Sequence, residues 1–402
     1  MYLKIYDDKK RKVIYMFRFK RIFLVVLDSV GVNHASDSDK FGDFGANTLG
    51  HVIEKTGVNL VNLKKMGFVN LALDRNDDVI SYYTYGKEIS NGKDTLTGHL
   101  EMMGIETKKP FKTFTENGFP DELIRELERV TGRKVIGNKS ASGTEIIKEL
   151  GEEHMKTGNI IVYTSADSVL QIACHEDIVP LNELYDICEK AREITLRDEW
   201  KVGRIIARPF IGEVGNFTRT SNRHDYALDP SGKTCLDSLK EAGFSVISIG
   251  KISDIFNNCG ITSSIKTKNN LDGIMKIMET LGNDFTGLCF ANLNDFDSSF
   301  GHRRDVDGYA NALMEFDSYL PSILDKLRDD DLLIITADHG NDPTWIGTDH
   351  TRENIPVAIY NKNFVGKGKI DDLETFADIG ASIADNFNVT WPLGTSFLGK
   401  LR

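Results

Sequence analysis

The chain has 402 residues, 40% of them hydrophobic, and its 49 basic and 60 acidic residues give a net charge of −11. A chain of this length can bury a large core and is expected to form about two domains. The acidic balance argues against nucleic acid or an anionic membrane as the main partner, so an anionic substrate would need local attraction from metal ions or a few arginines.

The cysteines and the start of the chain bear on where the protein works. Its five cysteines are scattered, odd in number and without a CxxC pair, which favours a reduced, cytoplasmic protein. No apolar run approaches the ~20 residues of a membrane span. Residues 1–20 are too charged for a signal peptide, so we expect an N-terminal extension, or sequence upstream of a true start at Met16.

Strand-like and helical segments alternate along the chain. Five apolar runs are predicted strands: residues 21–27, 244–250, 287–293, 332–336 and 355–360. Three amphipathic segments are predicted helices: residues 234–244, 307–330 and 375–387. This alternation predicts an α/β protein with a central, mostly parallel sheet and helices on both faces.

Three of these strands end in candidate metal-binding groups: Asp28; Asp297 and His302; and Asp338, His339 and, in the loop beyond, His350. Ligands gather at the carboxyl ends of strands in open α/β sheets, so the six groups converge if the strands are neighbours. Carboxylates and imidazoles without a thiolate suit manganese, zinc or magnesium, and six groups are enough for two ions. Singly, each residue could instead be a helix cap, a turn residue or a surface histidine.

A nucleophile is predicted in residues 91–104, NGKDTLTGHLEMMG, which pass from a glycine-flanked turn into a helix. Thr95 is the candidate, because a metal-bound threonine hydroxyl can form a covalent intermediate at a helix amino terminus. Thr97 competes for this role, and the ordinary alternative makes Asp94 or Thr95 a helix cap.

At this point the chain resembles the phosphopentomutase family, within the alkaline phosphatase superfamily of metalloenzymes. The similarity runs from about Arg21 to near the carboxyl terminus, and the motifs that carry it are VVLDSVG, GKDTLTGH, YTSADSVLQIACHE, RPFIGEVGNFTRTSNRHDYAL, DFDSSFGHRRD and TADHGNDPTWIGTDHTRE. The resemblance implies an alkaline-phosphatase-like core in which Thr95, not Thr97, is phosphorylated. It assigns one manganese to Asp28, Thr95, Asp338 and His339, and a second to Asp297, His302 and His350.

The resemblance also implies a catalytic core of residues 21–108 and 230–402, with an inserted α/β cap domain of residues 109–229 that keeps water from the reaction. Segments 119–132 and 181–196 read as helices of the cap, and 159–165 and 203–210 as strands. Six residues are implied substrate contacts: Ser165 and Asp167 for sugar hydroxyls, and Arg208, Arg219, Arg223 and Lys251 for a distal phosphate. The alternative for the arginines is a solvated basic loop, and His99 and His224 are expected to be structural.

The implied activity is the interconversion of ribose or deoxyribose 1-phosphate and 5-phosphate, through a phosphothreonine enzyme and a 1,5-bisphosphate. Its implied cofactors are two manganese ions and a sugar bisphosphate primer. The expected partners are small pentose phosphates, with no nucleic acid, membrane or obligatory protein partner. Two alternatives stay open: a phosphomonoesterase of the same core that transfers phosphate to water, and a metal-stabilised binding protein without turnover.

Overall fold

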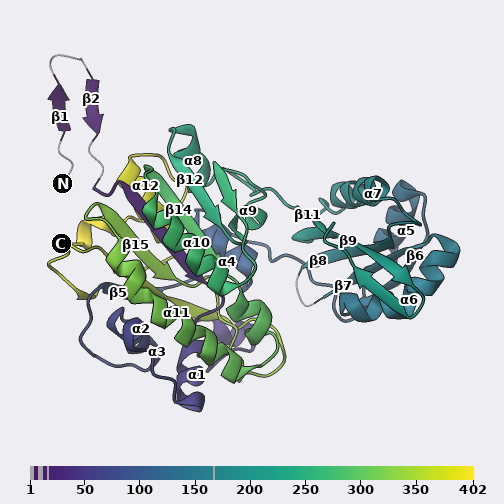
Figure 1. Ribbon diagram of the computed structural model, residues 1–402, viewed down its shortest axis with the longest axis horizontal. Helices are drawn as coiled ribbons and strands as arrows, with labels where there is room; N and C mark the ends of the chain where they lie inside the picture. The colour runs from purple at the N-terminus through teal and green to yellow at the C-terminus, as the bar shows by residue number, and fades with distance from the viewer. Residues whose placement is uncertain (1–3, 8–11, 16–17, 166–167) are drawn as a thin grey trace. The chain divides into compact units, whose positions relative to one another are not determined.

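The computed structural model describes residues 4–7, 12–15, 18–165 and 168–402, and it divides into two compact units (Figure 1). Unit 1 is Met1–Lys109 with Pro230–Arg402, and unit 2 is Pro110–Asp229. Near the start of unit 1, β1 (Lys4–Asp7) and β2 (Lys12–Tyr15) form an antiparallel pair of their own. The sequence of unit 2 is therefore inserted into the sequence of unit 1.

The sheet of unit 1 has nine strands, in the order β13-β12-β14-β3-β15-β16-β5-β17, with β4 paired to β16. Their bounds are β3 (Arg21–Leu27), β4 (Val32–His34), β5 (Tyr82–Gly86), β12 (Ser245–Ile249), β13 (Ser263–Ile265), β14 (Gly287–Leu293), β15 (Asp331–Thr336), β16 (Glu353–Tyr360) and β17 (Gly368–Lys369). The five strands from β13 to β15 are parallel, whereas β16 runs antiparallel to its neighbours.

The central strands of this sheet are buried throughout. Every residue of β3, β14 and β15 is buried, as expected for parallel strands covered on both faces. At the amino ends of β3 and β15, Arg21 and Asp331 form a fully buried ion pair, with Nη2 and Oδ2 2.6 Å apart. This pair links β3 and β15 at the edge of the sheet that lies opposite the carboxyl ends of these strands.

Helices flank this sheet, and Figure 1 shows α10 and α11 side by side. The helices of unit 1 are α1 (Thr48–Thr56), α2 (Val61–Lys65), α3 (Phe68–Ala72), α4 (Thr95–Met102), α8 (Cys235–Glu241), α9 (Ile252–Ile255), α10 (Asn270–Gly282), α11 (Val306–Lys326) and α12 (Ala377–Phe387). Three short helices complete the unit: η1 (Ser38–Phe41), the π-helix η2 (Phe296–Gly301) and η3 (Leu398–Lys400).

Unit 2 has a six-stranded mixed sheet in the order β10-β9-β8-β7-β6, with β11 paired to β9. Its strands are β6 (Val135–Ser140), β7 (Ile160–Thr164), β8 (Val169–His175), β9 (Arg204–Glu213), β10 (Asn216–Arg219) and β11 (His224–Ala227), and its helices are α5 (Asp121–Thr131), α6 (Gly143–Thr157) and α7 (Leu181–Ile194). One apolar cluster lies between the sheet and α5 and α7, and another lies between the sheet and α6. Unit 2 thus has a core of its own.

The α/β class predicted from the sequence, with a mostly parallel central sheet flanked by helices, is confirmed. All five strands predicted in unit 1 are present within one or two residues of their expected ends. The elements that were not predicted include α6, α10 and β8, which follows β7 almost at once. No helix in the described part of the chain is long and apolar enough to cross a membrane, and all five cysteines are free thiols.

Candidate active site

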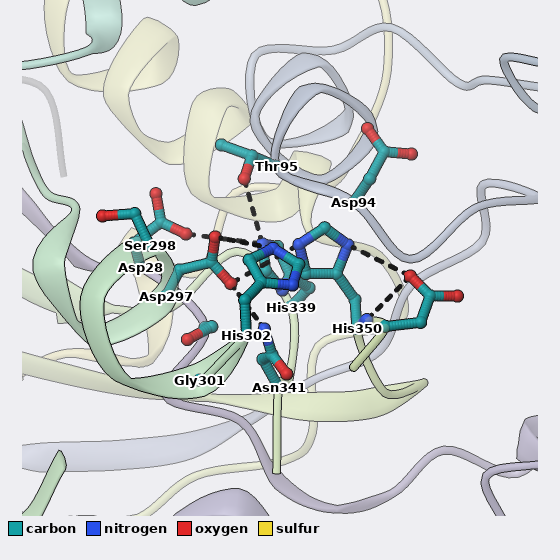
Figure 2. Close-up of polar contacts among 12 residues, drawn as sticks. Asp28, Asp94, Thr95, Asp297, Ser298, Gly301, His302, His339, Asn341 and His350 are labelled. Atoms are coloured by element: carbon teal, nitrogen blue, oxygen red, sulfur yellow. Dashed lines mark hydrogen bonds and ion pairs between the residues drawn. The ribbon is translucent and has the colours of Figure 1, made fainter. Parts of the chain in front are cut away.

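The strand order explains how distant residues meet. Because β14, β3 and β15 are parallel neighbours, the segments that follow them leave the same edge of the sheet. Asp28 follows β3 directly, Asp297 lies in η2 beyond β14, and Asp338 and His339 follow β15. His350 comes from the loop before β16, and Figure 2 shows its ring beside those of His302 and His339. The six strand-end groups predicted from the sequence are therefore neighbours.

The first of two groups able to hold a metal ion consists of Asp28, Asp338 and His339. His339 Nε2 lies 3.4 Å from Asp28 Oδ1 and 3.4 Å from Asp338 Oδ2. The other oxygen of each carboxylate is held in place: Asn292 Nδ2 donates to Asp28 Oδ2 (2.9 Å), and Ser29 N donates to Asp338 Oδ1 (3.0 Å). Both carboxylates thus turn one oxygen toward His339.

The second group consists of Asp297, His339 and His350. His350 Nε2 lies 3.4 Å from Asp297 Oδ1, and His302 Nε2 lies 3.3 Å from Asp297 Oδ2. Asn341 Nδ2 also donates to Asp297 Oδ1, at 2.8 Å. His339 belongs to both groups, so the six strand-end groups form one continuous cluster, with His302 at its more exposed rim (23% of its side chain).

Buried atoms without hydrogen-bond partners show that this cluster suits cations. Asp28 Oδ1, Asp338 Oδ2 and His350 Nε2 are buried and, among the described residues, have no such partner. Leaving polar atoms of this kind unsatisfied is costly, and a divalent ion would satisfy them. The three atoms belong to the two groups just described. The donor set, carboxylate and imidazole only, matches the hard and borderline ions predicted from the sequence.

The charges in the cluster point the same way. Burial alone would raise the pKa of Asp297, but the His350 and His302 imidazoles bring it well below its ordinary value. Burial would lower the pKa of His339, but the carboxylates of Asp338 and Asp28 raise it well above its usual range. Asp297 is therefore held in its ionised form, and the negative charge of Asp338 and Asp28 that raises the pKa of His339 would also favour a bound cation.

Thr95 enters the cluster from α4. It is the first residue of this helix, and its Oγ1 lies 3.1 Å from His339 Nε2 (Figure 2). The hydroxyl of Thr97 instead donates to Asp94 Oδ2 (2.7 Å), and in Figure 2 the side chain of Asp94 points away from the cluster. Gly98 lets α4 approach closely, because a Cβ there would lie 2.1 Å from the carbonyl oxygen of Asp338. This geometry favours Thr95 over Thr97 as the nucleophile.

Asp94 is the helix cap. Its Oδ1 accepts from the backbone N–H groups of Leu96 (3.0 Å) and Thr97 (3.1 Å). Free N–H groups at a helix amino terminus can bind a phosphate, but these two amides already donate to Asp94. A phosphate on Thr95 would depend on nearby cations instead.

Sequence reasoning missed four residues that hold the cluster together: Ser29, Asn292, Arg304 and Asn341. Ser29 has a left-handed backbone (φ 70°), which directs its N–H to Asp338. Arg304 bridges the π-helix and the loop before His350, donating to the carbonyls of Gly301 (2.8 Å) and Asp349 (2.9 Å). Asn292 could have been found, since it is a polar residue inside the otherwise apolar run 287–293.

The implied substrate contacts are placed within each unit separately. In unit 1, Lys251 Nζ donates to Asn294 Oδ1 (2.8 Å), which belongs to the segment that leads into η2. In unit 2, Arg208 Nε donates to Gln171 Oε1 (3.0 Å). Burial and the positive charges of neighbouring arginines lower the pKa of Arg208. Arg208 therefore lies in a cluster of like charge that an anion would relieve.

The other implied contacts in unit 2 differ from Arg208. Arg219 is exposed on β10, and Ser165 is half-buried at the end of β7. Arg223 is paired with Asp225 through two hydrogen bonds of 2.6 Å each, so this carboxylate offsets part of its charge. A phosphate would have to compete with Asp225 for Arg223. Asp167 lies outside the described residues.

A family model agrees with a metal site. Residues 20–390 match the Metalloenzyme superfamily. The PH0037 protein of Pyrococcus horikoshii is 15% identical, with 94% of this chain and 100% of that chain covered and a TM-score of 0.49. A phosphoglycerate mutase of Leishmania mexicana, determined at low cobalt concentration, is 11% identical (98% and 99% covered, TM-score 0.47). The alkaline phosphatase of the Antarctic bacterium TAB5 is 13% identical (93% and 99% covered, TM-score 0.32).

Proposed function

This chain belongs to the Metalloenzyme superfamily, and we propose that it is a manganese-dependent phosphopentomutase that interconverts (deoxy)ribose 1-phosphate and 5-phosphate. The observation that carries the proposal is the position of the Thr95 hydroxyl, 3.1 Å from the one histidine shared by two metal-capable groups. A binding protein would have no use for a hydroxyl held there. The motifs GKDTLTGH, YTSADS and FTRTSNRHD support a pentose phosphate as the substrate.

In the proposed centre, Asp28, Asp338, His339 and Thr95 hold one ion, and Asp297, His302 and His350 hold the other. When bound, the ions would lower the pKa of the Thr95 hydroxyl and offset charge on the transferring phosphoryl oxygens. Buried partners such as Asn292 and Ser29 fix the carboxylates before substrate arrives. The site therefore does not have to reorganise during transfer.

The proposed cycle begins with phosphate on Thr95. A hydroxyl of the pentose monophosphate attacks the phosphorus, the bond from phosphorus to Thr95 Oγ1 breaks, and a 1,5-bisphosphate forms. After the bisphosphate turns, Thr95 Oγ1 attacks its other phosphate, the sugar oxygen leaves, and the phosphothreonine is restored. The hydroxyl proton lost in the first step is regained in the second, so no co-substrate is consumed. Arg208 and Arg219 bind the phosphate that is not being transferred, with Ser165, Asp167 and Lys251 as further contacts.

The test is a product ratio. The protein with manganese, ribose 1-phosphate and a trace of ribose 1,5-bisphosphate should form ribose 5-phosphate in large excess over inorganic phosphate. Intact mass should fall by one phosphate after phosphatase treatment, with the modification mapped to Thr95. If inorganic phosphate is the main product, the protein is a phosphomonoesterase. If neither product forms in the presence of divalent ions, it is not an enzyme acting on pentose phosphates.

A further inference from the structure

His99 lies one helical turn beyond Thr95, and no part of its side chain is exposed. Its Nδ1 is 2.8 Å from the carbonyl oxygen of Thr95 and 3.1 Å from Asp338 Oδ2. Its Nε2 is 3.3 Å from Asn292 Nδ2. The ring stacks on Phe290, with centroids 5.7 Å apart and an interplanar angle of 28°. One imidazole thus contacts the nucleophile's backbone, a metal-capable carboxylate and the residue that holds a second carboxylate.

The neighbours of His99 fix which ring nitrogen carries the proton. Asn292 must turn its NH₂ toward Asp28, because the carboxylate Oδ2 can only accept. The second N–H of that amide then faces His99 Nε2, which must be the unprotonated acceptor. Nδ1 therefore carries the proton that is donated to the Thr95 carbonyl (2.8 Å), and Asp338 Oδ2 lies 3.1 Å from the same nitrogen.

Resting on the proposed function, we infer that His99 is the positioning residue for the first metal ion and for the nucleophile. Through Nδ1 it links the start of α4, and hence Thr95, to Asp338. Through Nε2 and Asn292 it sets the orientation of Asp28. A purely structural histidine would need only the bond to the carbonyl four residues earlier in its helix. Partners of this kind, beyond the metal ligands themselves, typically change metal affinity or activity by about 10–100-fold.

The experiment measures manganese binding directly, by calorimetry on the chelated and dialysed full-length protein. His99→Phe keeps an aromatic ring that can stack on Phe290, but it removes the polar contacts of both ring nitrogens. We expect one of two manganese ions to bind about 10–100-fold more weakly and the other to bind nearly as before. His154→Phe is the matched control, since His154 is also fully buried and hydrogen-bonded, but in unit 2. It should leave both manganese affinities unchanged.

Two milder exchanges separate the contacts and guard against misfolding. His99→Asn can keep a donor near the position of Nδ1, and His99→Gln can keep an acceptor near the position of Nε2. We expect each to recover part of the manganese affinity, and at saturating manganese His99→Gln should lower kcat while leaving KM for the pentose phosphate within about twofold. Wild-type manganese affinity in folded His99→Phe would overturn the inference. If the wild type binds two ions yet lacks mutase activity, the proposed function fails and the role of His99 stands.

Discussion

The two units hold their candidate functional groups in different ways. In unit 1, Asp338 and His339 are buried and each contacts several other groups of the cluster. In unit 2, Arg219 is exposed and Arg208 is half-buried with a single side-chain hydrogen bond to Gln171. Burial and cross-linking suit groups that must stabilise a transition state, because these must be oriented in advance. Lightly held groups suit recognition of a sugar phosphate that has to turn between two steps.

The largest expected effect tests the nucleophile of unit 1. Thr95→Ala removes the oxygen that is proposed to carry the phosphate, so turnover should fall by roughly 10⁴-fold or more. Manganese binding and the unfolding transition should change little, because Thr95 is one of several groups around that ion. The measurements are steady-state pentose phosphate isomerisation and intact mass, which should lose the added phosphate.

Thr97→Ala is the matched control for that exchange. It removes the bond to Asp94 and should weaken the cap of α4 by about 1 kcal/mol, with at most a modest effect on rate. If Thr97→Ala abolished turnover and Thr95→Ala did not, the nucleophile would be misassigned, and with it the contrast between a preorganised unit 1 and an adaptable unit 2.

The second effect concerns metal in unit 1. His350→Ala removes a buried nitrogen that has no hydrogen-bond partner in the described structure, so one manganese ion should be lost and the rate should fall roughly 10²–10⁴-fold. Calorimetry counts the ions, and excess manganese should recover part of the activity. His224→Ala in unit 2, where the ring lies against Tyr185 and Tyr226, should leave the count at that of the wild type. Full activity after exhaustive chelation would contradict the metal assignment.

The contrast between the units also decides what the sequence could reveal. In unit 1 the apolar runs ending at Leu27, Leu293 and Thr336 marked three strands, and the polar residues after them marked the site. Parallel strands bring such residues to one edge, so position in the sequence was enough to predict the cluster. Ser29 was not predictable, because its role depends on a left-handed backbone that gives no signal in a serine.

The sequence revealed less about unit 2. Arg208 and Arg223 look alike in a basic, strand-rich stretch, and only the fold shows that Arg223 is paired with Asp225 across two residues of chain. Local composition cannot distinguish an arginine that is paired with a carboxylate from one that is available to a ligand.

In unit 1 as well, one choice needed the fold. Asp94 and Thr95 were both possible caps, and the distances around α4 decided between them.

The third prediction sharpens the role of unit 2. Arg208→Gln and Arg219→Gln should each slow transfer between sugar positions by about 10–100-fold, since a charged contact to phosphate contributes roughly 1.5–3 kcal/mol. Hydrolysis of the phosphothreonine should slow less, so the ratio of ribose 5-phosphate to inorganic phosphate should fall. Arg223→Gln should change this ratio only a few-fold. Arg129→Gln, which breaks an exposed pair with Glu126, should not change it.

If Arg208→Gln, Arg219→Gln and Arg223→Gln lowered the product ratio equally, pairing with a carboxylate would not decide how much each arginine contributes. A larger loss for Arg223→Gln than for Arg208→Gln would reverse the assignment of the phosphate contacts. In either case the description of unit 2 as lightly held and selective would have to be abandoned.

The last effect is on stability rather than on rate, and it has opposite signs in the two units. In unit 1, burial raises the pKa of Glu353 to about 8. Between the unfolded value, roughly 4.3, and pH 8, the folded chain holds a proton that the unfolded chain has lost, so the free energy of unfolding falls as pH rises, by at most about 1.4 kcal/mol per pH unit. Glu353→Gln keeps the shape of the group without this proton and should flatten the fall between pH 5 and 8.

In unit 2, burial would raise the pKa of Asp225, but Arg223 lowers it below its ordinary value. Its stabilising contribution is therefore present above the unfolded value, near pH 4, and is lost as pH falls through the folded value. Asp225→Asn should remove that acid-side loss and leave the profile above pH 5 unchanged.

Denaturant unfolding across pH 3–8 measures the contributions of both Glu353 and Asp225. The protein is chelated first, since a bound cation near Glu353 would favour its ionised form. Parallel profiles for the wild type and Glu353→Gln would show that Glu353 is ionised in the folded protein, held by its bonds to Thr48 and Thr351. The buried charge of Glu353 would then be fully hydrogen-bonded within unit 1. The difference between the two units would rest on the metal-binding cluster alone.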